Sequence, residues 1–260
     1  MSFSGVPWAG LHTVSTNVKH TSVEVEPDVR LHVAEQGAGP LVVLLHGFPD
    51  GWELWQSLQH ALAEAGFRAL AVEQRGYPRS DQPHGIGRYR ITRLAADVAA
   101  VIEHYGADTA AVVGHDFGGG VAWAFAMAYP QRLDRLVIVN APHPRRFVQS
   151  LRTLGQLRKS WYMAAMQLPW LPERVTGAPT GAVNWYRALR FGGPAITRID
   201  DPVLVIWGER DPYLGRELAQ PYPTDVPNAQ LVRLETAGHW PQREQPEQVN
   251  ALITAFLRQP

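Results

Sequence analysis

The six residues GHDFGG, at positions 114–119, separate two apolar stretches, 109–113 before them and 121–128 after them. An apolar run of strand length, a glycine-rich turn and a second apolar run predict a strand, a sharp turn and a helix. The glycines of the motif allow the tight turn and the close approach of helix and strand. A related pattern, Gly-x-Ser-x-Gly, places a nucleophilic serine on such a turn. Here Asp116 takes the central place, so we predict a carboxylate nucleophile.

Short apolar runs and helical patterns alternate on both sides of this turn. Strands are expected at 41–45, 67–72, 109–113, 133–139, 203–207 and 230–234, with two or three antiparallel strands within 11–36. Helices are expected over 52–65, over 91–105, from Phe117 to 128, and from Pro246 onward. Strands that alternate with helices predict an α/β fold, with a mostly parallel twisted sheet flanked by helices.

Residues 142–200, which we call the insertion, break this alternation with proline and tryptophan residues and Gly-Pro turns. We predict a small, mainly helical lid here, placed between two core strands. The chain then divides into a first core part (1–141), the lid (142–200) and a second core part (201–260). The segment 145–159 contains Arg145, Arg146, Arg152, Arg158 and Lys159 and no acidic residue. We interpret this segment as a solvated helix face rather than an anion-binding site.

Composition excludes several classes of protein. Lys and Arg together number 24, as do Asp and Glu, so there is no basic excess of the kind that binds nucleic acid. There is no cysteine, which excludes disulfides, thiolate metal sites and a cysteine nucleophile. The first ten residues lack a secretory signal pattern, and no apolar run approaches the roughly 20 residues of a membrane span. We expect a cytoplasmic monomer or homodimer with no nucleic-acid or membrane partner.

Two later motifs supply partners for Asp116. The motif TAGHWPQ places His239 in a loop after a late strand, and GERD places Glu209 and Asp211 after the strand at 203–207. Nucleophile, acid and histidine in this chain order match a Ser-Asp-His type of triad. We prefer Asp211 to Glu209 as the acid that orients the histidine, because it lies further into the loop. Asn140 occupies another possible acid position, but it carries no charge.

The motif HGFP follows the strand at 41–45 and can aim the backbone N–H of Phe48 at the site. The N–H of Phe117, next to the nucleophile, is its expected partner in an oxyanion hole. His46 and His115 lie in the same two motifs. We interpret His46 as a support for its loop and His115 as a packed residue of the turn, not as proton-transfer groups.

An aspartate at this turn indicates displacement at a saturated carbon. A serine that attacked such a carbon would form an ether, which water does not readily cleave. A carboxylate forms an ester, which the same site can hydrolyse with its oxyanion hole and a histidine-activated water. The natural electrophiles are epoxides and alkyl halides, and neither reaction requires a cofactor or a metal.

The leaving group distinguishes these two electrophiles. A departing halide needs N–H donors, typically an indole beside the nucleophile, and Phe117 at that position has none. An epoxide oxygen leaves as an alkoxide and needs a proton donor, for which a lid tyrosine is suitable. The insertion offers Tyr162 in SWYMAAMQLP and Tyr186 in NWYRAL.

The chain resembles the epoxide hydrolases of the α/β-hydrolase superfamily. The matching motifs are HGFP (46–49), RGYPRSD (75–81), GHDFGG (114–119), NWYRAL (184–189), GERD (208–211) and GHWPQ (238–242). The resemblance, which covers about 30–255, implies the α/β-hydrolase fold. It also implies roles for five residues: Asp116 as nucleophile, His239 as the base that activates water, Asp211 as orienting acid, and Tyr162 and Tyr186 as the pair that holds and protonates the epoxide oxygen.

The chain departs from this family pattern in two places. Phe117 replaces a tryptophan, and only its backbone is needed for the oxyanion hole. Tyr162 and Tyr186 are only 24 residues apart, so the lid is short.

Three alternatives stay open. One is a haloalkane or haloacid dehalogenase with the same nucleophile, although glycines 118–120 stand where a haloacid enzyme would carry arginines. Another is a biosynthetic enzyme that opens an epoxide by cyclisation. The third is a non-catalytic ligand-binding member.

Overall fold

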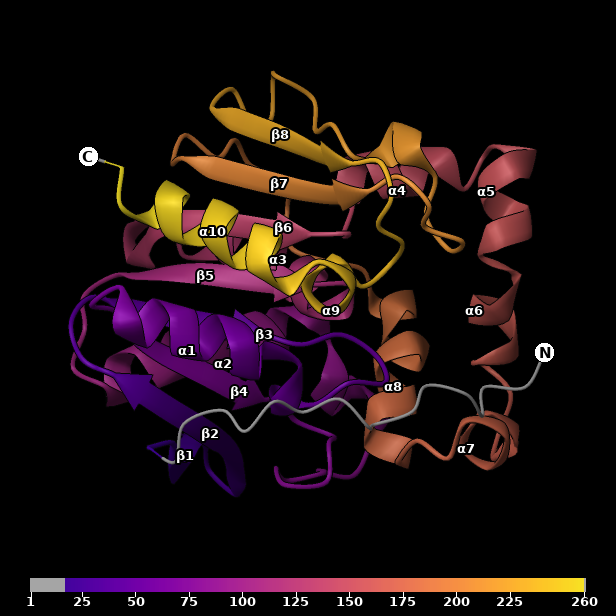
Figure 1. Ribbon diagram of the computed structural model, residues 1–260. Helices are drawn as coiled ribbons and strands as arrows, with labels where there is room; N and C mark the ends of the chain where they lie inside the picture. The colour runs from indigo at the N-terminus through magenta and orange to yellow at the C-terminus, as the bar shows by residue number, and fades with distance from the viewer. Residues whose placement is uncertain (1–16, 260) are drawn as a thin grey trace.

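The computed structural model describes residues 17–259. The start of the expected antiparallel segment, 11–16, and the first ten residues, which were considered for a signal sequence, lie outside the described residues. It contains an eight-stranded sheet with the order β1-β2-β4-β3-β5-β6-β7-β8 (Figure 1). The strands are β1 (Lys19–Glu26), β2 (Val29–Gly37), β3 (Leu41–Leu45), β4 (Arg68–Glu73), β5 (Ala110–His115), β6 (Leu133–Val139), β7 (Val203–Gly208) and β8 (Ala229–Leu234). The β1–β2 and β2–β4 pairs are antiparallel and the other five pairs are parallel, which confirms the predicted mostly parallel sheet.

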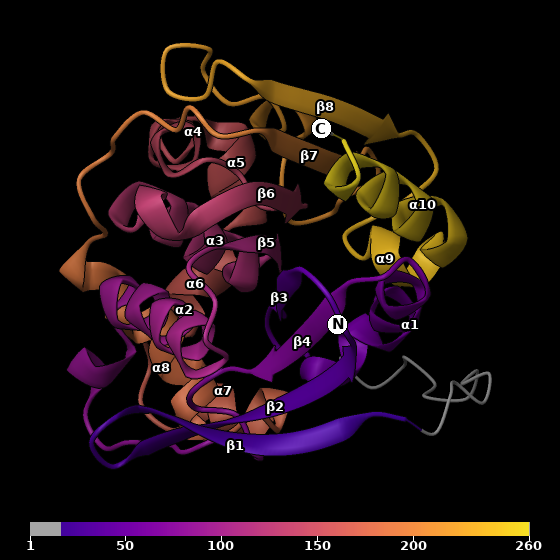
Figure 2. The same ribbon diagram turned by 90° about the vertical axis from the view of Figure 1, so that its left-hand side faces the viewer.

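Helices cover both faces of this sheet, as the alternating pattern predicts. On one face lie α1 (Gln56–Glu64), α9 (Pro241–Glu244) and α10 (Pro246–Leu257), and on the other lie α2 (Ile91–His104) and α3 (Phe117–Ala128) (Figure 2). The expected helix at 52–65 begins with a 3-10 turn, Trp52–Trp55, before α1. The central parallel strands β3 and β5 are buried on both faces, which is why they read as continuous apolar runs.

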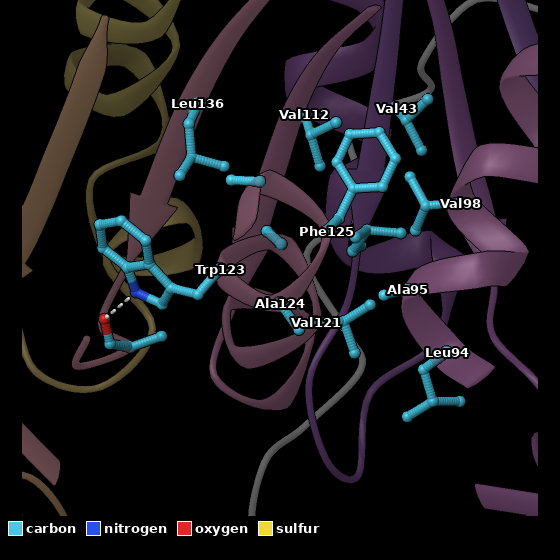
Figure 3. Close-up of a cluster of buried hydrophobic side chains, with 14 of the residues drawn as sticks. Val43, Leu94, Ala95, Val98, Val112, Val121, Trp123, Ala124, Phe125 and Leu136 are labelled. Atoms are coloured by element: carbon cyan, nitrogen blue, oxygen red, sulfur yellow. Dashed lines mark hydrogen bonds between the residues drawn. The ribbon is translucent and has the colours of Figure 1, made fainter. Parts of the chain in front are cut away.

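The core between the sheet and the α2–α3 face fixes the position of the strand-to-helix turn at 114–119. Phe125 of α3 is fully buried and lies near Val43, Val98 and Val112 in Figure 3. Truncation of a buried phenylalanine to alanine costs about 3–5 kcal/mol through lost burial and a cavity. This packing holds α3 against the sheet.

The insertion lies between β6 and β7 and covers the carboxyl ends of the parallel strands (Figure 1). Its helices are α4 (Pro144–Ser150), α5 (Leu154–Lys159), α6 (Trp161–Ala165), α7 (Leu171–Thr176) and α8 (Thr180–Ala188). The last of these is tied to the core, because the Trp185 indole N–H donates to the carbonyl of Arg75 at 2.9 Å.

The interpretation of 145–159 as a solvated face is wrong for three of its cations, of which Arg146 donates to the carbonyl of Gln220 at 2.9 Å. The Lys159 ammonium donates to the carbonyls of Asp211 (3.0 Å) and Leu214 (3.2 Å). Arg145 pairs with the buried Asp225 at 3.0 Å. Arg152 and Arg158 are exposed, as that interpretation predicts. Among residues 17–259, no helix is long and apolar enough to cross a membrane.

Candidate active site

Asp116 occupies the sharp turn between β5 and α3. Its backbone has φ 51° and ψ −121°, a conformation that non-glycine residues rarely adopt and that costs about 1–3 kcal/mol. The glycines around it permit this close packing. A Cβ on Gly118 would lie 2.3 Å from the carbonyl oxygen of Leu45, and one on Gly47 would lie 2.5 Å from the Cβ of Asp116. The strained turn therefore projects one carboxylate at the end of the sheet.

Two backbone N–H groups meet the carboxylate of Asp116. The N–H of Phe48 donates to Oδ1 at 3.0 Å, and the N–H of Phe117 also hydrogen-bonds the carboxylate. Burial favours the neutral acid, but the hydrogen bond and charge of His239, together with the Phe117 N–H, outweigh it and lower the pKa of Asp116. Phe48 and Phe117 thus lie where the sequence analysis expects the oxyanion hole.

His239 lies between two carboxylates. Its Nδ1 is 2.7 Å from Asp211 Oδ2, and its Nε2 is 3.5 Å from Asp116 Oδ2. Burial opposes a charged imidazole, but hydrogen bonds with Asp116 and Asp211 and their charges outweigh it and raise the pKa of His239 to about 10. The two carboxylates that flank His239 therefore favour the charged form of its imidazole.

Asp211 is held by the loop that follows β7. Its Oδ1 accepts the N–H groups of Tyr213 (2.7 Å) and Leu214 (2.9 Å), and its Oδ2 faces His239. Glu209, the alternative acid, is directed away from the histidine. It pairs with Arg233 and lies 3.8 Å from Arg216. Of the two candidate acids, the structure brings only Asp211 to His239.

Asn140 contributes to the site in a way that the sequence analysis misses. It follows β6 with φ 42°, and its side-chain amide donates to Asp211 Oδ2 at 2.7 Å. Its Oδ1 accepts the backbone N–H of Gly208 at 2.8 Å, at the end of the neighbouring strand β7. The predicted strand order could have indicated this contact, because consecutive parallel strands usually lie side by side and Asn140 and Asp211 follow two such strands.

Tyr186 and Tyr162 of the insertion lie together above the carboxylate. The ring of Tyr186 packs edge-on against Phe117 (4.7 Å between centroids) and Phe48 (5.2 Å). Tyr162 is 6.1 Å from Tyr186 between ring centroids, and the two side chains hydrogen-bond. Burial, then nearby groups that include Asp116, raises the pKa of both phenols, so both keep their protons at neutral pH.

A third tyrosine, Tyr213, was not expected at the site. Its ring lies 5.2 Å from that of His239 and 5.8 Å from that of Tyr162 between centroids. It therefore forms part of the wall between the base and the insertion. The sequence around Tyr213 does not distinguish it from an ordinary loop residue, so only the fold reveals its place at the site.

The insertion is hydrogen-bonded to the loop that carries Asp211. The Gln156 amide of α5 donates to the carbonyl of Tyr213 at 3.0 Å and accepts the N–H of Gly215 at 3.2 Å. Lys159, one turn along, donates to the Asp211 and Leu214 carbonyls. Gln156 is buried, and a buried amide with all its partners in place fixes one geometry.

His46 and His115 are fully buried behind the site. His46 accepts the N–H of Gln74 at 3.1 Å, and His115 donates from Nε2 to the carbonyl of His239 at 2.8 Å. Burial is the main reason that the pKa of His46 falls to about 4 and that of His115 to about 3. Both rings are neutral and support the two loops. Within 17–259, no cluster of three His, Asp or Glu side chains is arranged to hold a metal ion.

A family model described as the alpha/beta hydrolase fold matches residues 40–183 of this chain. The AB hydrolase superfamily protein YfhM of Bacillus subtilis (strain 168) is 36% identical over 274 positions, which cover 88% of this chain and 95% of that protein. Epoxide hydrolase 1 of Caenorhabditis elegans is 33% identical, over 88% of this chain and 68% of that protein. A crystal structure of an epoxide hydrolase from Bacillus megaterium with an inhibitor is similar at a TM-score of 0.85, with 28% identity over 93% of this chain and 100% of that one.

Proposed function

The chain belongs to the α/β-hydrolase superfamily, in the epoxide hydrolase family within it, and we propose that it hydrolyses an epoxide to a vicinal diol through an ester on Asp116. One observation carries the proposal. The Asp116 carboxylate has one oxygen on the Phe48 N–H and the other facing His239, beneath a pair of tyrosines. The substrates are then a small epoxide and water, and the location that we propose is the cytoplasm.

In the first step, Asp116 Oδ2 attacks a carbon of the epoxide while the carbon–oxygen bond of the ring breaks. The oxygen departs as an alkoxide and takes a proton from Tyr186 or Tyr162 of the insertion, which serves as a lid. Asp116 Oδ1 stays on the Phe48 N–H and becomes the carbonyl oxygen of the ester. The low pKa of Asp116 keeps the nucleophile ionised at neutral pH.

In the second step, water attacks Cγ of the ester and gives its proton to His239. The N–H groups of Phe48 and Phe117 stabilise the oxyanion on Oδ1, and the diol leaves with the former Oδ2. Formation of the ester removes the negative charge that Asp116 places beside His239. The pKa of the imidazole falls as a result. The proton that the imidazole releases returns to the tyrosinate left by the first step, and the neutral imidazole becomes the base that this step requires.

An epoxide is favoured over an alkyl halide by the donors at the site. Phe117 has no side-chain N–H beside the nucleophile. The indoles of Trp185 and Trp240 pack near the site, but their N–H groups donate to the Arg75 carbonyl (2.9 Å) and to Asp50 (2.9 Å). Neither indole is free to hold a halide, whereas two protonated phenols are available for an alkoxide.

The variant His239→Gln tests the proposal, because the displacement needs no base and the hydrolysis does. The variant should open one equivalent of substrate and stop at the ester. Intact-mass spectrometry should show the full mass of an added epoxide, since the oxygen stays attached as a hydroxyl, and a peptide map should place it on Asp116.

An alkyl halide would add only its carbon skeleton and release halide. Adducts from bromoalkanes but not from epoxides would establish the dehalogenase alternative and remove the proposed role of Tyr186. A folded variant that forms no adduct with either class would contradict the nucleophilic role of Asp116.

A further inference from the structure

The large apolar side chains that are exposed are confined to one part of the molecule. Among residues 17–259, every such side chain lies between Val148 and Ile196, inside the insertion. They are Val148, Leu154, Leu157, Trp161, Leu168, Trp170, Leu171, Val175, Leu189, Phe191 and Ile196. Scattered exposed apolar residues need no explanation, but a concentration of them marks an interaction surface.

Helix α5 is amphipathic in the opposite sense to a usual surface helix, with two polar side chains facing the protein and two apolar ones facing solvent. Its polar residues Gln156 and Lys159 point inward, where they hydrogen-bond the loop at 211–215. Leu154 and Leu157 point outward and are 75% and 47% exposed. Burial of these two leucines is not what holds the helix in place. Their apolar face is left unpartnered on the outside of the insertion.

The apolar face continues onto α6 and α7. Figure 1 shows α5, α6 and α7 following one another along one edge of the molecule, so their outer sides form one surface. Trp161 on α6 is 69% exposed, and Trp170, which precedes α7, is 64% exposed. Tryptophan is enriched where a protein surface meets the interface of a membrane. We call the outer side of α5, α6 and α7 the outer face.

The charge of this region is strongly positive, although the whole chain is neutral. Residues 142–193 contain eight Arg and Lys residues and one acidic residue, Glu173. Glu173 is neutralised by Arg187 at 2.8 Å. Arg158 on α5 and Arg152, which lies just before that helix, are exposed and form no ion pair with any described residue. Arginine beside exposed leucine and tryptophan is the composition of a surface that binds anionic lipid headgroups.

We propose that the outer face docks peripherally on an anionic lipid bilayer. Leucine and tryptophan side chains would enter the boundary between headgroups and acyl chains, while Arg152 and Arg158 would contact lipid phosphates. A second copy of the chain is disfavoured as the occupant, because two outer faces would bring like charges together. The composition of the chain alone led us to expect no membrane partner; the reversal of α5 changes that expectation.

The test measures binding of the full chain to sedimented vesicles. Vesicles of phosphatidylcholine and phosphatidylglycerol in about equal parts should bind the protein, vesicles of phosphatidylcholine alone should bind it far less, and high salt should release it. The double variant Arg152→Glu, Arg158→Glu should lower the binding constant by about ten-fold or more. The double variant Leu154→Ser, Leu157→Ser should also lower it.

A matched control has the same change in charge elsewhere. Arg30→Glu with Arg258→Glu alters β2 and the end of α10, which lie away from α5 to α7 in Figure 1, and should leave binding nearly unchanged. Circular dichroism establishes that each variant is folded. If the leucine variant does not fold, the arginine variant still tests the proposal, because Arg152 and Arg158 are solvent-exposed.

Three results would overturn the proposal. One is a lack of binding of the unmodified chain to phosphatidylglycerol vesicles. Another is an equal loss of binding in the control variant. The third is a dimer in analytical ultracentrifugation that Leu154→Ser with Leu157→Ser dissociates, without any vesicle binding. None of these measurements depends on epoxide turnover.

Discussion

The amide of Asn140 donates to Asp211 Oδ2, the same oxygen that faces His239. The two residues follow neighbouring strands, β6 and β7, and Asn140 also accepts the N–H of Gly208 at the end of β7. Asp211, the proposed orienting acid, is therefore fixed from a second strand as well as from its own loop. Because the Asn140 amide is neutral, it supports the Asp211 carboxylate without placing a second charge beside it.

Removal of this amide should slow ester hydrolysis more than alkylation, because only hydrolysis needs an oriented base. Asn140→Gly deletes the hydrogen bonds while it tolerates φ 42°, and we expect about a ten-fold loss in the hydrolytic step. Asn140→Ala, its matched partner, adds backbone strain and should also lower thermal stability. Rapid-quench kinetics measure the two steps separately. Equal slowing of both steps in the glycine variant would contradict a positioning role.

Asp116→Ala should abolish turnover, because no other group at the site can form the ester. A single turnover of the unmodified enzyme in ¹⁸O-water should leave the first diol unlabelled, since its new oxygen comes from Asp116. Label should instead enter the aspartate, where a peptide map can find it. A labelled first diol would mean that water attacks the epoxide directly.

The two lid tyrosines should differ in importance. Tyr186 packs on Phe48 and Phe117, so Tyr186→Phe should slow alkylation by roughly 10²-fold through loss of general-acid catalysis. Tyr162 reaches the site through Tyr186, so Tyr162→Phe should cost less. The double variant tests whether one tyrosine can replace the other as proton donor. Unchanged alkylation in all three variants would remove the tyrosines from the mechanism.

The two chemical steps should respond differently to pH. Alkylation needs ionised Asp116, whose pKa is lowered, so its rate should stay level between about pH 5 and 8. Hydrolysis needs neutral His239, so its rate should fall about ten-fold per pH unit below the pKa of that group in the ester. Acidic quench samples should then contain accumulated ester by intact mass. A level hydrolytic rate across this range would exclude His239 as the base.

His143, which neither chemical step uses, should make the fold sensitive to acid. Both of its ring nitrogens are buried without hydrogen-bond partners, and burial lowers its pKa to about 4. The unfolded chain, with a histidine pKa near 6.5, binds more protons between those values. The free energy of unfolding should thus decrease as the pH falls from about 6.5 to 4. Urea midpoints for His143→Phe should show a shallower decrease, and an unchanged slope would contradict this account.

The sequence was sufficient for the elements whose pattern is local. The strands at 41–45 and 133–139 were predicted at their observed bounds, because each is one apolar run that ends at polar or turn residues. Asp116 could be assigned to the turn for the same reason. His239 and Asp211 could be proposed from chain order, and the fold brings His239 to Asp116 and Asp211 to His239.

Contacts between distant segments could not be predicted in this way. Gln156 and Lys159 reach a loop more than 50 residues further on, and no periodicity encodes that contact. The reversed faces of α5 illustrate the same limit. Leu154 and Leu157 have the spacing of core residues, and only the partners of Gln156 reveal which side faces inward.

The hydrogen bonds from α5 to the loop at 211–215 also bear on protein engineering. The insertion is not an interchangeable module, because Gln156 and Lys159 satisfy backbone groups at and beside Asp211. A chimera made to change substrate selectivity, with an imported insertion that lacks Gln156 and Lys159, would leave these backbone groups without their partners. The loop must be transplanted together with the insertion, as one cassette, for the acid to keep its orientation.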